Sequence, residues 1–156
     1  MGAVAVLTAC NKTKINSNRL SGEVWKVVSI TTDGEPFEQD DLPELEFEDC
    51  DIYDEVCMGH WALEDEEAHF AWQFSDNGEL FTLSNQSEMD HDHDHEEDHE
   101  EDHDDGHEHM NPTEQCQNFS GSYKVEDSKR KSMKISSSET VGYFGVEVLI
   151  ELELSE

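Results

Sequence analysis

The chain has 156 residues, and its 40 acidic residues outnumber the 9 basic ones, which gives a formal net charge of −31. This length permits one domain, and a hydrophobic fraction of 34% predicts a modest core. An acidic surface of this kind argues against nucleic-acid binding and attracts cations or basic partners. We therefore expect a monomeric, single-domain protein without a nucleic-acid partner.

The first ten residues, MGAVAVLTAC, are apolar up to Cys10, and the residues that follow are polar. This abrupt change is typical of a processed amino terminus. The stretch LTAC that ends at Cys10 resembles the lipobox of bacterial lipoproteins, which implies cleavage before Cys10 and attachment of lipid to its sulfur. Residues 1–9 would then be a signal peptide with a truncated start, since its basic region is missing, and residues 10–19 a lipidated polar tether.

The resemblance to lipoproteins also implies a location. Asn11, rather than an acidic residue, follows Cys10, and this favours the outer membrane of a Gram-negative envelope, on its periplasmic face. Nine apolar residues cannot span a bilayer, so the chain would be soluble without the lipid.

From Leu20 onwards, apolar and polar residues alternate in short segments that are separated by turn residues, which is typical of β-strands. We expect eight strands and no helix; the strands cover residues 23–31, 44–49, 57–64, 68–75, 79–85, 117–126, 131–137 and 143–154. Asp76-Asn77-Gly78 predicts a tight hairpin between the fourth and fifth strands. The fold class is therefore all-β, as an antiparallel up-and-down barrel that removes exposed sheet edges, or alternatively as a sandwich.

The predicted core follows from the alternating faces of these strands. The three tryptophans are expected in it because large aromatic side chains on an alternating strand face usually pack inside. The last strand alternates most clearly, and its inward face would carry Phe144, Val146, Val148, Ile150, Leu152 and Leu154.

The first strand opens with Leu20-Ser21-Gly22-Glu23-Val24-Trp25-Lys26. This opening resembles the Gly-x-Trp signature of lipocalins, although two residues rather than one separate Gly22 from Trp25. Together with the meander that follows, it is similar to the lipocalin-like lipoproteins of bacterial envelopes. The resemblance implies a lipocalin-like barrel over residues 20–156, with Trp25 closing its base.

Residues 90–109 form a tract of seven Asp, five Glu, seven His and one Gly. No side chain here suits an apolar core, and the carboxylates repel one another, so we expect a disordered loop within residues 87–115, between the fifth and sixth strands. The histidines recur first at alternate positions, which share one side of an extended chain, and then at every fourth position, which are neighbours on a helical turn. They are His91, His93, His95, His99, His103, His107 and His109.

The donor types in this tract indicate which metals it would bind. Imidazole suits zinc, copper and nickel, whereas carboxylates alone favour calcium and magnesium. The composition predicts several overlapping, labile sites for Zn²⁺, Cu²⁺ or Ni²⁺ rather than one site of fixed geometry. The alternative is a solvated charged loop that needs no ligand.

Three cysteines follow Cys10. Cys50 and Cys57 flank the connection between the second and third strands, and an envelope location permits disulfides, so a hairpin disulfide is the simplest pairing. Cys116 would then be a buried free thiol, or would pair with Cys57 instead, or would supply a thiolate to metal bound by the tract.

His60 and His69 lie outside the tract, on the less apolar faces of the third and fourth strands. No Cys or carboxylate spacing links them to a metal site, so we interpret them as solvent-exposed surface residues.

Three functions fit these features. The first is a non-enzymatic, lipid-anchored protein that binds or buffers divalent transition metal through its His-rich loop. The second is a lipocalin-type carrier of a small apolar ligand in the barrel mouth, and the third is a structural envelope lipoprotein without a ligand. We expect no enzymatic activity, because no nucleophile elbow, phosphate loop or zinc-hydrolase motif occurs.

Overall fold

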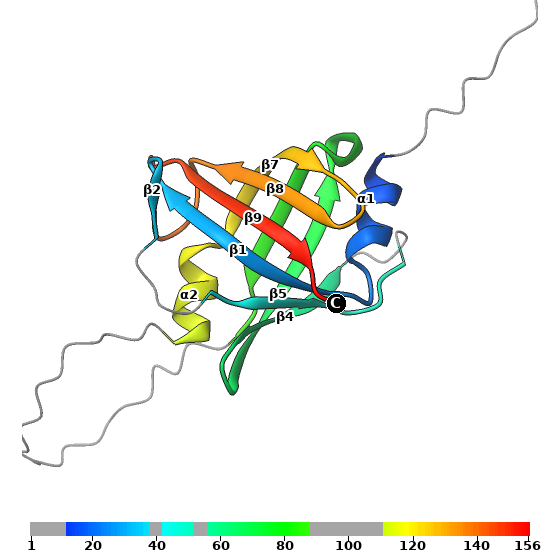
Figure 1. The fold of residues 1–156 in the computed structure, drawn as a ribbon, viewed down its shortest axis with the longest axis horizontal. Coiled ribbons are helices and arrows are strands. Elements are labelled where there is room, and N and C mark those ends of the chain that lie inside the picture. Colours follow the sequence, from blue (N-terminus) through cyan, green and yellow to red (C-terminus); the bar gives the residue numbers. More distant parts are fainter. Residues whose placement is uncertain (1–11, 38–41, 52–55, 88–110) are drawn as a thin grey trace, which may run out of the picture.

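A computed structural model describes residues 12–37, 42–51, 56–87 and 111–156. Cys10 and all seven tract histidines lie outside these ranges. The described residues form two α-helices, one short 3-10 helix and nine strands (Figure 1). In chain order they are α1 (Lys12–Leu20), β1 (Val24–Thr32), β2 (Glu35–Pro36), β3 (Glu44–Phe47), β4 (Cys57–Leu63), β5 (Glu66–Ser75), η1 (Asp76–Gly78), β6 (Leu80–Asn85), α2 (Pro112–Asn118), β7 (Gly121–Ser128), β8 (Ser132–Ser137) and β9 (Val148–Leu154).

Eight of these strands close into an antiparallel barrel. The strands are hydrogen-bonded in the order β1-β3-β4-β5-β6-β7-β8-β9, and β9 pairs back with β1, with Thr32 opposite Val148. The two-residue strand β2 pairs only with the end of β1. The predicted eight-stranded up-and-down barrel is confirmed, and the sandwich alternative is wrong because closure joins the first and last long strands in one sheet.

Large aromatic side chains fill the barrel. Trp25 and Trp61 are fully buried and Trp72 is 2% exposed, so the prediction that all three tryptophans pack in the core is confirmed. Phe47 lies edge-on to Trp72, with ring centroids 5.3 Å apart, and to Phe70 at 5.7 Å. Such pairs stabilise the fold beyond the burial of their area.

The turn before β1 depends on glycine. Gly22 has φ +73°, which side-chain-bearing residues rarely adopt, and a Cβ added there would lie 2.5 Å from Asp49 Oδ1. Trp25 lies three residues further on, and its indole N–H donates to the Arg19 carbonyl at 3.3 Å. The end of α1 therefore covers the tryptophan that the lipocalin resemblance assigns to the barrel base.

The expectation that no helix occurs beyond Leu20 is wrong at α2. It begins after Asn111, whose side chain accepts a hydrogen bond from the Glu114 backbone N–H at 2.8 Å, and Pro112 stands at its first position. This Asn-Pro-x-Glu pattern is an ordinary helix start. The helix takes residues that were predicted as the beginning of the sixth strand, which instead begins at Gly121.

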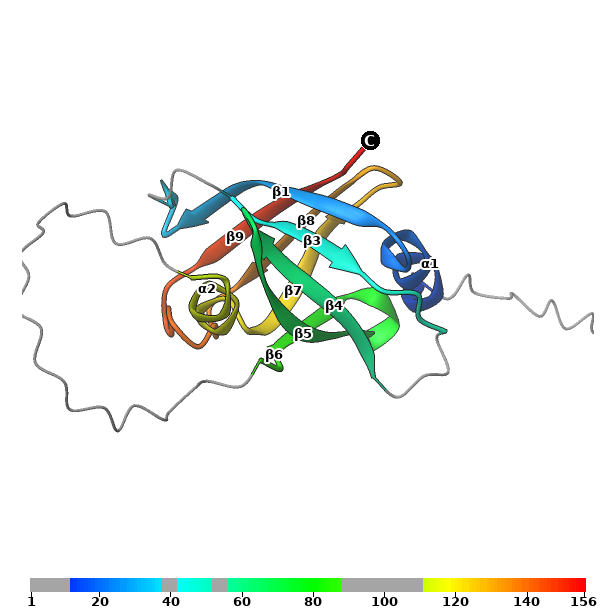
Figure 2. The same ribbon diagram turned by 90° about the horizontal axis from the view of Figure 1, so that it is seen from below.

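The second helix, α1, occupies most of the segment interpreted as a polar tether. It packs on the barrel: Asn16 Nδ2 donates to the Gly78 carbonyl at 3.1 Å, and Leu20 is fully buried. Gly78 permits this approach, since a Cβ there would lie 2.8 Å from the Lys12 carbonyl carbon. Figure 2 shows α1 and α2 at opposite ends of the barrel. Of the helices in the described ranges, none is long and apolar enough to cross a membrane.

The last strand is shorter than predicted. Val148, Ile150 and Leu152 face the core as expected. Residues 143–147 instead form turns in which Gly145 has φ +81°, and Phe144 is 81% exposed. Apolar residues alternate in the sequence of this loop as they do in β9, which is why the predicted strand begins too early. The turn at Gly145 separates the loop from β9, which begins at Val148.

Candidate metal centre

The strands β3, β4 and β5 place a group of His and Glu side chains on the outer surface of the barrel. Successive side chains along a strand point to opposite faces, so His60 of β4 shares the outer face with Glu67 and His69 of β5. His60 lies directly opposite His69 in the β4–β5 pair and opposite Glu46 in the β3–β4 pair. Opposed residues have Cβ atoms about 4.5–5.5 Å apart, so this register brings the two imidazoles together.

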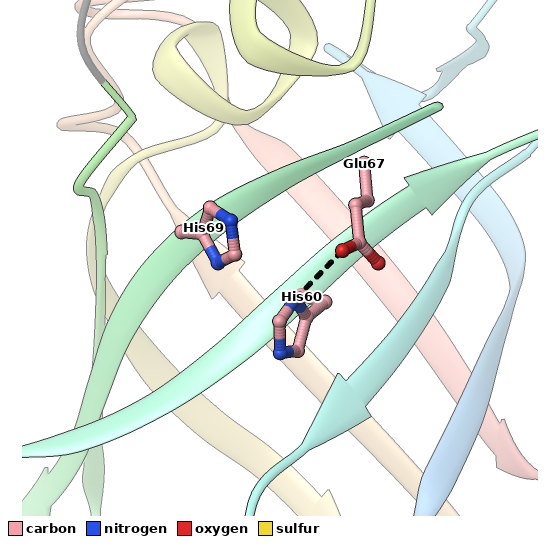
Figure 3. Close-up of side chains that lie close together, drawn as sticks. All are labelled: His60, Glu67 and His69. Carbon is pink, nitrogen blue, oxygen red and sulfur yellow. Dashed lines mark ion pairs between the residues drawn. The ribbon is translucent and has the colours of Figure 1, made fainter. Parts of the chain in front are cut away.

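The distances suit a shared cation. His60 Nδ1 is 3.4 Å from Glu67 Oε1, and the Glu67 carboxylate points at the His60 ring (Figure 3). The rings of His60 and His69 have centroids 4.7 Å apart. One ligand atom from each of the three residues lies within 4.8 Å of the other two.

These separations can be compared with zinc geometry. With metal–ligand bonds of about 2.0–2.1 Å, two ligand atoms of a tetrahedral zinc ion lie about 3.3 Å apart. The His60–Glu67 pair is already at this separation, and the remaining distances of up to 4.8 Å must shorten by about 1.5 Å or less. Side-chain rotations of the exposed Glu67 and His69 supply such a change without moving the strands.

The two ring nitrogens of His60 have different surroundings. Nε2 is 3.0 Å from Glu48 Oε1, and this hydrogen bond assigns the ring proton to Nε2. Nδ1 is buried and has no hydrogen-bond partner among the described residues. The Glu67 carboxylate faces Nδ1 at 3.4 Å, so a proton or a metal ion on Nδ1 would lie beside a negative charge. Glu48 thus has the place of the carboxylate that commonly orients a metal-bound histidine.

The local charge favours cations of every kind, protons included. Burial alone would lower the pKa of His60, but its hydrogen bond to Glu48 and the negative charges of Glu67, Glu48 and Glu46 together raise that pKa above 6.5. The His60 side chain is 18% exposed, whereas Glu48 and Glu67 are 50% and 53% exposed, so solvent screens part of the attraction. A metal must therefore compete with a proton for this ring.

A disulfide holds Glu48 next to His60. Cys50 and Cys57 are bonded, with Cα atoms 5.6 Å apart, so the predicted pairing is confirmed. It joins the chain after β3 to the first residue of β4, and the Glu48 backbone N–H donates to the Met58 carbonyl at 3.1 Å in the same connection. The link limits how far Glu48 and His60 can separate.

The His-rich tract joins the barrel beside this centre. The His69 backbone N–H donates to Ser87 Oγ at 2.7 Å, and Asp90, the first residue of the tract, is three residues after Ser87. His91 is four residues after Ser87, so an extended chain separates the two residues by at most about 14 Å. At the far end of the tract, Asn111 caps α2, which packs against β4, β5 and β6.

The structure describes His60 and His69 but not the predicted metal ligands of the tract or Cys10. The seven tract histidines and Cys10 lie outside the described residues, so their roles stay predictions. His69 is exposed, as expected for a surface residue, whereas His60 is mostly buried and lies in the His60–Glu67–His69 group. The sequence interpretation missed this group because it did not pair the two strands residue by residue.

Cys116 is a buried free thiol, which confirms one of the three alternatives. It is fully buried, and burial raises the pKa of its thiol to about 12. A thiol that stays protonated is a poor metal ligand, so the proposed thiolate role is not supported. Pairing with Cys57 is wrong, because Cys57 is bonded to Cys50.

No family model matches this chain, and no curated protein is significantly similar to it in sequence. The candidate metal centre therefore rests on its own geometry.

Proposed function

We propose that the protein is a non-enzymatic, lipid-anchored metal-binding protein of the Gram-negative envelope, which holds Zn²⁺, Cu²⁺ or Ni²⁺ at His60, Glu67 and His69 and in the tract. The observation that carries this proposal is the convergence of these three side chains within 4.8 Å, with Nδ1 of His60 buried and without a hydrogen bond. Two imidazoles and one carboxylate are a ligand set that zinc uses.

We expect the barrel site, formed by His60, Glu67 and His69, and the His-rich tract to differ in how they bind and release metal ions. Three protein ligands leave a fourth position for water, which allows an ion at the barrel to be passed on. The tract offers several overlapping sets of imidazoles and so binds several ions at moderate affinity. Because the tract begins three residues after Ser87, beside His69, ions released from it reach the barrel site at high local concentration.

The lipocalin-type carrier is the runner-up. The closed antiparallel barrel is compatible with a lipocalin-like fold and therefore with such a carrier. The inward side chains of the described strands, however, are large rings that contact one another, as in Phe47 with Trp72 and Phe74 with Phe81. No observation favours a bound apolar molecule over this packing, whereas the outer surface carries a specific ligand group.

Zinc titration calorimetry on four proteins tests the metal function. We expect the wild type to show one tighter site and several weaker ones. Glu67→Gln should remove the tighter site, while Glu44→Gln, an equally neutralised exposed carboxylate on the same outer face, should keep it. A variant with all seven tract histidines changed to Asn should lose the weaker sites alone. Equal zinc binding by the Glu67 and Glu44 variants would contradict the barrel site.

The lipid anchor has a separate test. Mass spectrometry of protein from a Gram-negative host should show an acylated Cys10 as the first residue, and Cys10→Ser should abolish both cleavage and membrane association. Native protein that keeps residues 1–9 and stays soluble would contradict the anchor and leave the metal site untouched.

A further inference from the structure

Two exposed apolar side chains lie three residues apart in the β8–β9 loop, residues 138–147. Phe144 is 81% exposed and Val141 is 58% exposed. Among the large apolar side chains of the described ranges, Phe144 has the highest exposed fraction. The loop lies beside α2, at the end of the barrel opposite α1 (Figure 2).

Contacts with the barrel hold this loop in place. The Val141 backbone N–H donates to the Ser120 carbonyl at 3.0 Å, which ties the loop to the chain between α2 and β7. Between the two exposed residues, Tyr143 stacks on the fully buried Phe119, with ring centroids 5.2 Å apart. Phe144 is therefore presented to solvent by a loop whose neighbouring residues are fixed, so little conformational freedom remains to be lost when a partner binds.

Carboxylates border the two apolar side chains. Glu139 and Glu147 belong to the loop itself, and the Asp33 backbone N–H donates to the Glu147 carbonyl at 2.8 Å. Glu114 of α2 lies near the loop, because burial and, to a smaller extent, the negative charge of Glu114 raise the pKa of Tyr143. All four acidic residues are exposed.

No basic residue accompanies these carboxylates. None of the nine Lys and Arg residues lies in the loop, in α2 or in the β1–β2 turn. Six of them lie in α1 or in the β7–β8 turn, which Arg19 joins to α1 at the opposite end of the barrel. The other three, Lys26, Lys124 and Lys134, each pair with a glutamate. Within the described ranges, none of the four carboxylates forms an ion pair of 4.0 Å or less.

We propose that this surface docks onto a partner protein whose own surface has an apolar centre bordered by Lys and Arg side chains. We call the surface the aromatic knob, and it consists of Val141, Phe144, Asp33, Glu114, Glu139 and Glu147. Buried aromatic side chains contribute much of the binding energy of protein interfaces, and a border of opposite charge selects the partner. An anionic membrane would be repelled by the same carboxylates, and this end of a second copy would bring four more. The inference goes beyond the metal function and depends on neither the metal centre nor the lipid anchor.

Fluorescence anisotropy with a labelled helical peptide tests the proposal on the full-length chain. The peptide carries one stripe of leucines flanked by lysines, which is the simplest surface of the required chemistry, and a second peptide has glutamates in place of the lysines. The wild type should bind the lysine peptide at least about tenfold more tightly than the glutamate peptide. Phe144→Ser should weaken binding of the lysine peptide about tenfold or more, and Val141→Ser roughly threefold.

The matched control is Val56→Ser, which makes the same change as Val141→Ser at a valine that is 60% exposed in the β3–β4 connection. All three variants keep every charge of the chain, so attraction of the lysine peptide to other acidic residues is the same in each. Val56→Ser should bind like the wild type, and equal peptide binding by Phe144→Ser and Val56→Ser would overturn the proposal.

The charged border has its own pair of variants. Glu139→Gln with Glu147→Gln should weaken binding of the lysine peptide about threefold or more, whereas Glu23→Gln with Glu79→Gln, an equal loss of charge at the α1 end, should have less effect. Equal losses in the two double variants would overturn the role of the border.

Two other measurements separate the remaining occupants. A wild-type dimer in sedimentation velocity that Phe144→Ser converts to a monomer would overturn the proposal in favour of a second copy. Binding to phosphatidylglycerol vesicles that Phe144→Ser abolishes would overturn it in favour of a membrane. The circular dichroism and zinc titration of Phe144→Ser should match the wild type, because the substituted side chain is exposed and belongs to another part of the barrel.

Discussion

Reduction of the Cys50–Cys57 disulfide should destabilise the fold by an amount that loop closure predicts. The bond closes a loop of eight residues, counted from a sequence separation of 7. In the chain-entropy account this stabilises the folded state by about 2.5 kcal/mol, which corresponds to a melting-temperature decrease of roughly 7–12 °C for a domain of this size. Circular dichroism of the metal-free protein with and without a phosphine reductant measures the decrease.

The double variant Cys50→Ser with Cys57→Ser provides the control, because it should melt near the reduced wild type and be insensitive to reductant. Cys116 is already a buried thiol, so among the described residues reduction breaks one bond, the Cys50–Cys57 disulfide. Reduction should also weaken zinc binding up to about tenfold, since Glu48 then orients His60 less firmly. The reasoning is refuted if alkylation shows a fully reduced disulfide while the melting temperature is unchanged, because loop entropy would then have no effect.

Three further outcomes are expected. Trp61→Phe should lower the free energy of unfolding in urea by about 1–3 kcal/mol, because the Trp61 indole N–H donates to the fully buried Gln115 Oε1 at 2.7 Å; a wild-type midpoint would contradict this. The pKa of His60 is raised above 6.5, so in metal-free protein its stabilising effect, measured against His60→Asn, should be complete below pH 6.5 and be lost as the pH rises through the folded-state pKa. Zinc, which needs the neutral ring, should show the opposite trend in titrations across the same range. Deletion of residues 90–109 should keep the β-type circular dichroism and preserve or raise the melting temperature, because it removes repelling carboxylates; loss of cooperative melting would show that the barrel needs them.

The barrel could be predicted because its strands obey a simple period. In β3, and in β5 from Glu67 onwards, buried residues alternate with more exposed ones, and the Asn77-Gly78 turn carries the positive φ values that such a hairpin requires. The helices were missed for two different reasons. The start of α2 has a recognisable cap at Asn111 and Pro112 that was overlooked. By contrast, α1 has few apolar residues, and its position depends on hydrogen bonds to distant turns.

The metal centre was missed because one turn was placed too far along the chain. In a two-residue hairpin centred on Glu64 and Asp65, Leu63 pairs with Glu66 and His60 consequently pairs with His69. The predicted third strand ends at residue 64 and the predicted fourth strand begins at residue 68. This places the centre of the hairpin more than one residue too far along the chain, so that His60 and His69 would not lie opposite each other. Neither Glu64 nor Asp65 is a typical residue of such a turn, yet Glu64 has φ +55°, so local sequence did not mark the turn. Since a one-residue slip moves every side chain to the other face, a metal site that spans two strands can be predicted only once the register is known. The tract needs no register, because its ligands are close together in the sequence itself.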